Sequence, residues 1–374
     1  MDLPDVVVSL ALGGPSVAFT ALNSVGTFTT TAHLIVHLSA GSNWGAGPSE
    51  ARAKTWISEH ASRVTINERQ LQVQAGTPGV LGAHLSNFEV CEQRRLCNGK
   101  NAKFVLMAAN VLMLRHGLEQ HVAAHSLSFC IHSSSCSDAH LSGDNQLWRE
   151  KLGELSWDPR STSSEDFARA VLLRRMRHSV RTSNDSAAVE DGWIARFVEL
   201  LRSGHLPPTW LARPIAQMPH EGSFYPVRVV RDFLRRGFRG SAFEAALQRQ
   251  QASGSHPCPC CDLYDTNTSW KSLGSCSFEE LLLPTFVWQH HPDLLRAAVP
   301  PSVLRVWANL HQPHNVTRVL CHLVAAPSGL GHFFGIKVPH FFLGKMMRDL
   351  LRLDPFGASV ERDPSWWSRI CRES

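Results

Sequence analysis

The sequence lacks any apolar run of the ~18 residues that a membrane-spanning helix needs, so we expect no transmembrane segment within it. Residues 1–12 also lack a basic region ahead of their apolar residues, and they carry acids at Asp2 and Asp5. They therefore do not predict a secretory signal peptide, and residues 6–10 predict a hydrophobic strand instead. We expect a soluble chain as written, and an anchor upstream of it stays open.

Charged residues are also scarce, at 18% of the sequence against 43% hydrophobic residues, and this balance excludes wholesale disorder. The formal net charge is only +5, yet basic residues cluster in two segments, 174–177 and 228–239. No segment interleaves aromatic and basic residues as a groove for single-stranded nucleic acid does. We therefore expect no nucleic-acid partner, and a basic cleft for a phosphate-bearing small molecule is the alternative.

A structural zinc is the less favoured use of the ten cysteines. Cys258 and Cys261 have the spacing of a zinc-binding pair, but no second matching pair follows. Disulfides of a secretory lumen, or loop thiols, fit better. A metal-binding interaction protein built on residues 258–276 is the weakest alternative function. The compartment stays open between the Golgi or secretory lumen, given an upstream anchor, and the cytoplasm.

Strand-like and helix-like segments alternate through the first 125 residues, which favours an α/β fold with a mainly parallel central sheet flanked by helices. Strands are expected at 6–10, 32–38, 64–66 and 104–107, and helices at 16–24, 52–61, 81–92 and from 117 onward. Ligands of such sheets gather beyond the carboxyl ends of the strands. His37, Asn43 and Asn110 follow such ends and are candidate binding residues.

Two short segments place ionisable side chains between bulky apolar residues: 219–226, which reads PHEGSFYP, and 277–285, which reads SFEELLLPT. Such a pattern lowers stability unless the side chains are paired or used. A carboxylate in that setting can have its pKa raised toward neutrality and act as a general base. The two segments are therefore the first indication of an enzyme.

Four segments carry a family resemblance: GAHLSNFE at 82–89, FVLMAANVLMLRHG at 104–117, HEGSFYP at 220–226 and EELLLPT at 279–285. In their order and rough spacing they resemble the core-2/I-branching β-1,6-N-acetylglucosaminyltransferases and the peptide O-xylosyltransferases, over about residues 6–352. The resemblance implies a GT-A-like nucleotide-sugar-binding fold. It also implies an inverting transfer from a UDP-sugar, with N-acetylglucosamine or xylose favoured, to a glycan or glycoprotein hydroxyl.

The resemblance implies no metal ion or other cofactor, and the sequence contains no Asp-x-Asp triplet, which agrees with this. It assigns the general base to Glu280 and places Lys337, with Arg348 behind it, against the donor diphosphate. Where the family often carries an Asp after the strand at 104–107, this sequence has Val111. That departure bears on donor positioning. It raises the alternative of a catalytically inactive relative that binds glycans or proteins.

With no internal repeat to divide it, the sequence predicts a single domain over residues 1–374. By the resemblance it comprises a nucleotide-binding half, a polar insertion, an acceptor and catalytic half, and a tail. These parts span 1–125, 126–164, 165–353 (with a Cys-rich insertion at 253–270) and 354–374. Within the second half a helix is expected around 301–310.

Each candidate site residue also has a structural alternative. Ser277 and Glu280 have the spacing of a helix capping box, and Glu279 fits a role at the same helix terminus. Lys337 fits an edge strand whose lysine reaches solvent. The other candidates fit contacts with donor or acceptor as well as structural roles: Asn87, Asn110, His220, Glu221 and Tyr225.

Overall fold

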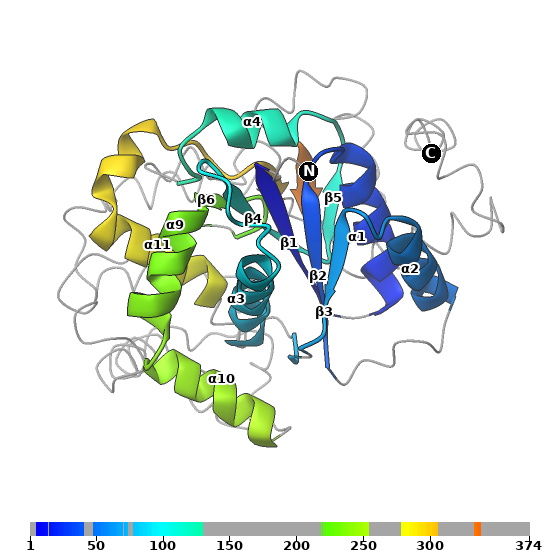
Figure 1. Cartoon of the computed structure of the whole chain (residues 1–374), viewed down its shortest axis with the longest axis horizontal. Helices are drawn as coiled ribbons and strands as arrows, with labels where there is room; N and C mark the ends of the chain where they lie inside the picture. The colour runs from blue at the N-terminus through cyan, green and yellow to red at the C-terminus, as the bar shows by residue number, and fades with distance from the viewer. Residues whose placement is uncertain are drawn as a thin grey trace, which may run out of the picture.

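The computed structural model describes residues 5–13, 15–40, 48–69, 71–73, 78–129, 218, 220–253, 278–305 and 333–337. A five-stranded sheet forms its centre, in the order β3-β2-β1-β4-β6 (Figure 1). Strands β1 to β4 are parallel, and β6 pairs with β4 in the antiparallel sense. The strands are β1 (Val6–Leu12), β2 (His33–Leu38), β3 (Val64–Asn67), β4 (Lys103–Ala108) and β6 (Phe224–Pro226). The expected α/β fold with a mostly parallel central sheet is confirmed.

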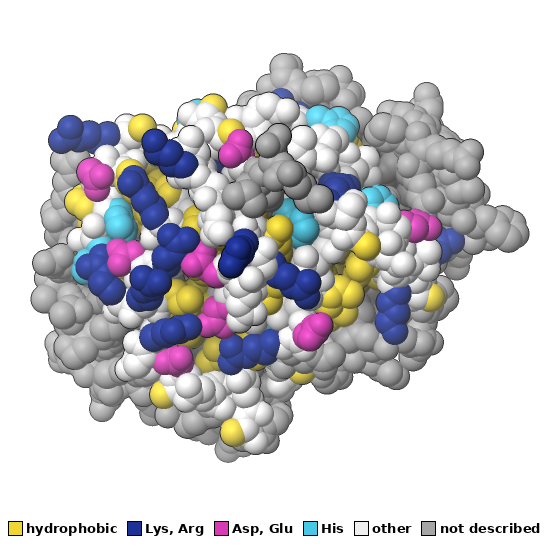
Figure 2. Space-filling model, in the orientation of Figure 1, with side chains coloured by type: hydrophobic (Ala, Val, Ile, Leu, Met, Phe, Trp, Pro, Cys, Tyr) yellow, Lys and Arg dark blue, Asp and Glu magenta, His cyan; other side chains and the backbone are white. Residues whose placement is uncertain are grey.

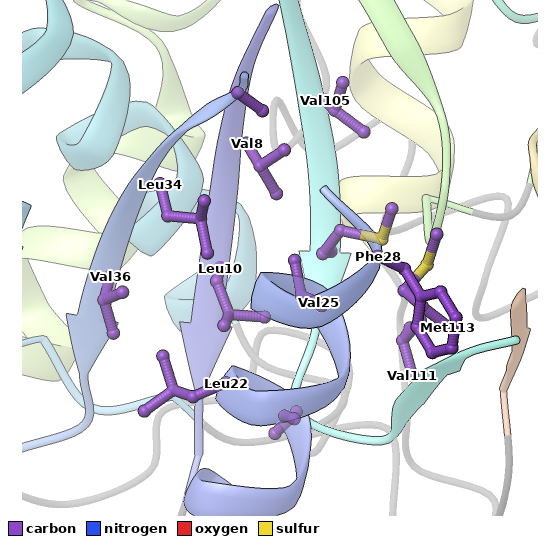
Figure 3. Packing of buried hydrophobic residues seen from close by; sticks show 14 of the residues in the cluster. Val8, Leu10, Leu22, Val25, Phe28, Leu34, Val36, Val105, Val111 and Met113 are labelled. Atoms are coloured by element: carbon purple, nitrogen blue, oxygen red, sulfur yellow. The ribbon is translucent and has the colours of Figure 1, made fainter. Parts of the chain in front are cut away.

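Helices cover both faces of this sheet, which explains why β1 is apolar at all but one position. Val8 and Leu10 pack with Leu22 and Val25 of the first helix (Figure 3), whereas Val7 belongs to the core on the other face. One face carries α1 (Pro15–Phe28) and α2 (Pro48–Glu59), and the other carries α3 (Pro78–Gln93), α9 (Val227–Asp232) and α11 (Phe278–His290).

The strand that follows β4 in the chain, β5, belongs to a second sheet. This sheet has three strands, in the order β5-β8-β7. β5 (Val111–Met113) is antiparallel to β8 (Gly335–Lys337), which runs parallel to β7 (Val303–Arg305). The helix expected around 301–310 is therefore wrong at residues 303–305. The backbone groups of these residues pair with β8, and this long-range pairing outweighs the local helical pattern.

The remaining described elements are α4 (Leu118–Ala124), the π-helix η3 (Phe233–Phe238), α10 (Ala242–Ser253) and the 3-10 helix η5 (Pro292–Ala297). No helix in the described part of the chain combines the length and the hydropathy that crossing a membrane requires. Lys and Arg side chains gather on the outer surface over α3 and α9 (Figure 2). Most of the two expected insertions, and all of the tail, lie outside the described residues.

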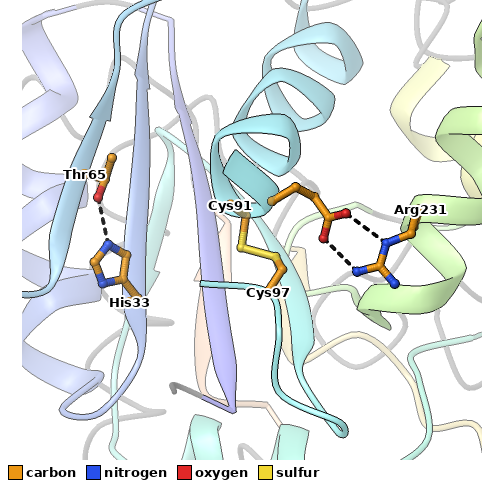
Figure 4. Close-up of a disulfide and its surroundings, with 6 residues drawn as sticks. His33, Thr65, Cys91, Cys97 and Arg231 are labelled. Carbon is orange, nitrogen blue, oxygen red and sulfur yellow. Dashed lines mark hydrogen bonds and ion pairs between the residues drawn. A yellow bond between two sulfur atoms is a disulfide. The ribbon is translucent and has the colours of Figure 1, made fainter. Parts of the chain in front are cut away.

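A disulfide joins Cys91, near the end of α3, to Cys97 (Figure 4). Between them the chain leaves the helix after Gln93, and Arg95 has a φ of 60°, in the left-handed region. The N–H of Leu96 donates to the Cys91 carbonyl at 2.9 Å, and the N–H of Arg95 donates to the Glu92 carbonyl at 3.1 Å. This is the Schellman arrangement, in which glycine usually takes the left-handed position. Here an arginine takes it inside a turn that the disulfide closes.

Candidate functional site

The HEGSFYP segment turns sharply at Gly222 before it enters β6. Gly222 has a φ of 74°, and an added Cβ would lie 2.5 Å from a neighbouring backbone nitrogen. Its N–H donates to the Leu106 carbonyl at 2.8 Å, and its carbonyl accepts from the N–H of Ser302 at 3.0 Å. The turn is thus held between β4 and the segment that leads into β7, where only glycine fits. His220 and Glu221 precede it, toward the carboxyl end of β4.

Four ionisable side chains meet at this turn, and we call them the Glu221 cluster: His220, Glu221, Glu279 and Lys337. The Lys337 ammonium donates to the Glu221 carboxylate. His220 Nε2 lies 3.3 Å from Glu221 Oε1, and His220 Nδ1 lies 3.7 Å from Glu279 Oε1. The turn before β6, the first turn of α11 and the strand β8 therefore bring two carboxylates and an ammonium around one imidazole.

The Glu221 cluster is buried. Its side chains are 0% exposed at Glu221, 4% at His220, 5% at Glu279 and 13% at Lys337. Burying an ionisable group lowers stability unless the group is paired. An ionised carboxylate only accepts hydrogen bonds, and the Lys337 ammonium supplies a donor to Glu221. Chemically, the arrangement holds an imidazole between two carboxylates, and it can present an ammonium to an anion.

A buried polar network continues from His220 into the central sheet. The His84 ring of α3 lies 5.7 Å from the His220 ring, and His84 Nδ1 lies 2.8 Å from Ser9 Oγ of β1. Asn87 Nδ2 also donates to Ser9 Oγ, at 2.9 Å, so the Ser9 hydroxyl joins β1 to two side chains of α3. Burial, and then the nearby His220 and His37, hold the pKa of His84 well below its usual range. His84 is therefore a neutral link between the cluster and the sheet.

Asn87 and His37 are bonded into the fold, which favours their structural alternatives. Asn87 Nδ2 donates to the Ile35 carbonyl at 3.0 Å, and Asn87 Oδ1 accepts from Asn67 Nδ2 at 2.8 Å. His37 Nε2 accepts the N–H of Leu71 at 3.0 Å. Burial lowers the pKa of His37 to about 4, so the ring is neutral at pH 7. These bonds tie β1, β2 and β3 to α3 and to the segment after β3.

The structure places the other candidates as follows. Asn110 is buried directly before β5, and Tyr225 lies in the core on β6, where burial raises the pKa of its hydroxyl. Glu280 is in the first turn of α11, but its side chain lies outside the described part of the structure. Asn43 and Arg348 lie outside it entirely. The structure therefore groups His220, Glu221, Glu279 and Lys337, and it adds Ser9 and His84, which the sequence analysis did not select.

Ser9 had one signal in the sequence, since it is the only polar residue in the strand VVVSLAL. Within the described ranges, no group of three or more His, Cys, Asp and Glu side chains is arranged to hold a metal ion. No model of a known protein family matches the sequence, and a search of curated proteins finds no match. Function is therefore inferred from the geometry of the Glu221 cluster and from the resemblance of the four sequence segments.

Proposed function

We propose that this chain is a GT-A-type glycosyltransferase that moves a sugar, with inversion, from a UDP-sugar to a hydroxyl of a glycan or glycoprotein. The observation that carries the proposal is the Glu221 cluster, which gathers buried ionisable side chains at the carboxyl end of β4. Ligands of α/β sheets bind at that edge, and buried clusters of ionisable side chains are candidate functional sites. The resemblance supports N-acetylglucosamine or xylose as the sugar.

The general base is one of two neighbouring carboxylates at the start of α11. In an inverting transfer, a carboxylate accepts the proton of the acceptor hydroxyl as that oxygen attacks the anomeric carbon. The resemblance favours Glu280, whereas the contact with His220 favours Glu279. Successive residues of an α-helix point about 100° apart, so we expect only one of these two positions to face the acceptor.

Lys337 is the candidate partner of the donor diphosphate. A fixed cation there stabilises the negative charge that develops on the leaving group. In the free protein Glu221 holds this ammonium, so a bound diphosphate competes with or shares it. His220 lies against the same carboxylate. It is therefore the side chain positioned to pair with Glu221 when Lys337 binds the diphosphate instead.

Donor binding and turnover test the proposal separately. A panel of UDP-sugars is screened for thermal stabilisation of the purified chain, and UDP release is then measured with glycan and glycopeptide acceptors. One UDP-sugar is expected to raise the melting temperature and to support transfer. E279Q or E280Q, whichever removes the base, should lower kcat by at least about 100-fold while donor binding persists. If no UDP-sugar stabilises the chain, the proposal fails.

A catalytically inactive relative that binds glycans or proteins is the second candidate, and one observation favours it. Val111, where the family often carries an Asp, is the direct β-sheet partner of Lys337. The carboxylate of Glu221 already neutralises this lysine. This candidate predicts that a UDP-sugar or glycan stabilises the chain, while UDP release stays at the rate measured without protein.

A further inference from the structure

A basic surface lies at the opposite end of the sheet from the Glu221 cluster. Its two segments, 89–100 and 228–239, carry eight basic and three acidic residues. Each of the three acidic side chains forms an ion pair with an arginine of the same surface: Glu92 with Arg231, Asp232 with Arg236, and Glu89 with Arg239. Five further cations are exposed and form no ion pair with a described residue: Arg94, Arg95, Lys100, Arg228 and Arg235.

The basic surface is built on a rigid frame. Two guanidinium nitrogens of Arg231 each donate to Glu92 at 2.8 Å, which ties α9 to the end of α3 (Figure 4). The N–H of Val227, beside Arg228, donates to the Ala102 carbonyl at 3.0 Å and holds α9 against the segment that leads into β4. The Cys91–Cys97 disulfide closes the turn that carries Arg94 and Arg95. Cations held by such a frame lose less backbone freedom when they bind a ligand.

The chemistry of the surface excludes several classes of partner. The described surface exposes one large hydrophobic side chain, Ile66 on β3, and none within the basic surface. Stable protein interfaces centre on buried aromatic or aliphatic anchors, and single-stranded nucleic acids stack on aromatic rings. Both features are missing in the described part of the surface. The disulfide is typical of oxidising compartments, where nucleic acids are not the usual polyanions.

We propose that the basic surface binds a sulfated polysaccharide. Sulfate groups stay ionised and are repeated along such a chain, so several exposed guanidinium groups can engage them at once. Arginine offers paired N–H donors to an oxyanion, and four of the five unpaired cations are arginines. Because the surface lies at the amino ends of the strands, a bound polysaccharide does not cover the end of the sheet that holds the Glu221 cluster. The inference does not depend on the proposed transferase activity.

Direct binding of fluorescein-labelled heparin tests the inference, with fluorescence anisotropy measured over a series of salt concentrations. The R94Q/R95Q/R228Q/R235Q variant should bind heparin at least tenfold more weakly than the unmodified chain and with a shallower salt dependence. The R52Q/K54Q variant of α2, on the other face of the sheet, is compared with R94Q/R95Q because both remove two charges. R52Q/K54Q should retain the affinity that R94Q/R95Q loses. Melting temperatures confirm that each variant folds.

Two competing ligands decide the chemical class of the partner. Polyglutamate and a single-stranded oligonucleotide, each matched to heparin in number of charges, should bind at least tenfold more weakly than heparin. Binding of either one as tight as that of heparin rejects the sulfated polysaccharide. Equal heparin affinity for the unmodified chain and the four-residue variant rejects the basic surface as the site. These measurements contain no UDP-sugar, so their failure is distinct from failure of the proposed function.

Discussion

Glu221 and Lys337 lie 116 residues apart in the sequence and form a buried ion pair. Glu221 belongs to the turn before β6, in the central sheet, whereas Lys337 ends β8 in the second sheet. The Glu221 side chain is fully buried, and that of Lys337 is 13% exposed. The pair therefore couples the two sheets, and it includes Lys337, the residue that the proposed function assigns to the donor diphosphate.

A double-mutant cycle should show this coupling. K337M leaves a buried carboxylate without its ammonium and should lower the free energy of unfolding by about 3–5 kcal/mol. The E221Q/K337M variant should lose clearly less than the sum of the two single variants, measured by urea unfolding. The exposed pair Asp232–Arg236 is the control, and R236M should cost less than ~1 kcal/mol. Additive losses at Glu221 and Lys337 would contradict the coupling.

Gly222 and Gly240 offer a matched pair of substitutions because both have a φ of 74°. An added Cβ meets nothing within 4 Å at Gly240, but at Gly222 it would lie 2.5 Å from the backbone nitrogen of Val303. G240A should cost only the left-handed backbone penalty, about 1–2 kcal/mol. G222A adds a steric clash with backbone and should cost clearly more in thermal or urea unfolding. Equal losses would mean that the turn can move away from β7.

Stability should fall on acidification because His37 is buried as the neutral ring. Its pKa is about 4 in the folded chain against 6.5 for the free side chain. Between these values the unfolded chain binds more protons, so stability is lost as the pH falls through that window. His37 should contribute a loss of roughly 2 kcal/mol between pH 7 and pH 5. H37Q should remove that part of the pH dependence in urea unfolding, and an unchanged slope would contradict the assignment.

Loss of the disulfide should destabilise the end of α3. Cys91 and Cys97 close a loop with a sequence separation of 6, for which chain entropy predicts roughly 2 kcal/mol. The C91A/C97A variant should show this loss in urea unfolding. Dithiothreitol should destabilise the unmodified chain by a similar amount through this bond. A loss in the variant well below 1 kcal/mol would indicate that the Schellman turn holds without the cross-link.

Local pattern predicted most of the first 125 residues well. The helix expected at 81–92 is α3 (Pro78–Gln93), and the strand expected at 104–107 is β4 (Lys103–Ala108). Both predictions are confirmed because the apolar spacing of a buried helix or strand lies within the residues of that element. The helix expected around 301–310 is wrong at 303–305. These residues form a strand because they pair with β8, some thirty residues further along the chain.

The candidate site was predicted in part. The two segments with ionisable side chains among apolar residues do meet, since His220 contacts both Glu221 and Glu279. The supporting contacts were not predicted: His84 against Ser9 joins a helix to a strand 75 residues away. The disulfide likewise used Cys91 and Cys97, whereas the pattern drew attention to the later cysteines. Such pairings depend on distance in space, which residue spacing along the chain does not report.

By itself, the sequence determined the alternation of strands and helices in the first 125 residues and the placing of ionisable side chains between bulky apolar residues at 219–226 and 277–285. These are local properties, set by the spacing of apolar residues along the chain. Only the tertiary structure decided that Lys337 is neutralised by Glu221 and that Val111 lies opposite it. It also decided that α9 joins the end of α3 in one basic surface. Long-range contacts join residues that are distant in the sequence, and the residues next to each one in the chain do not identify its partner.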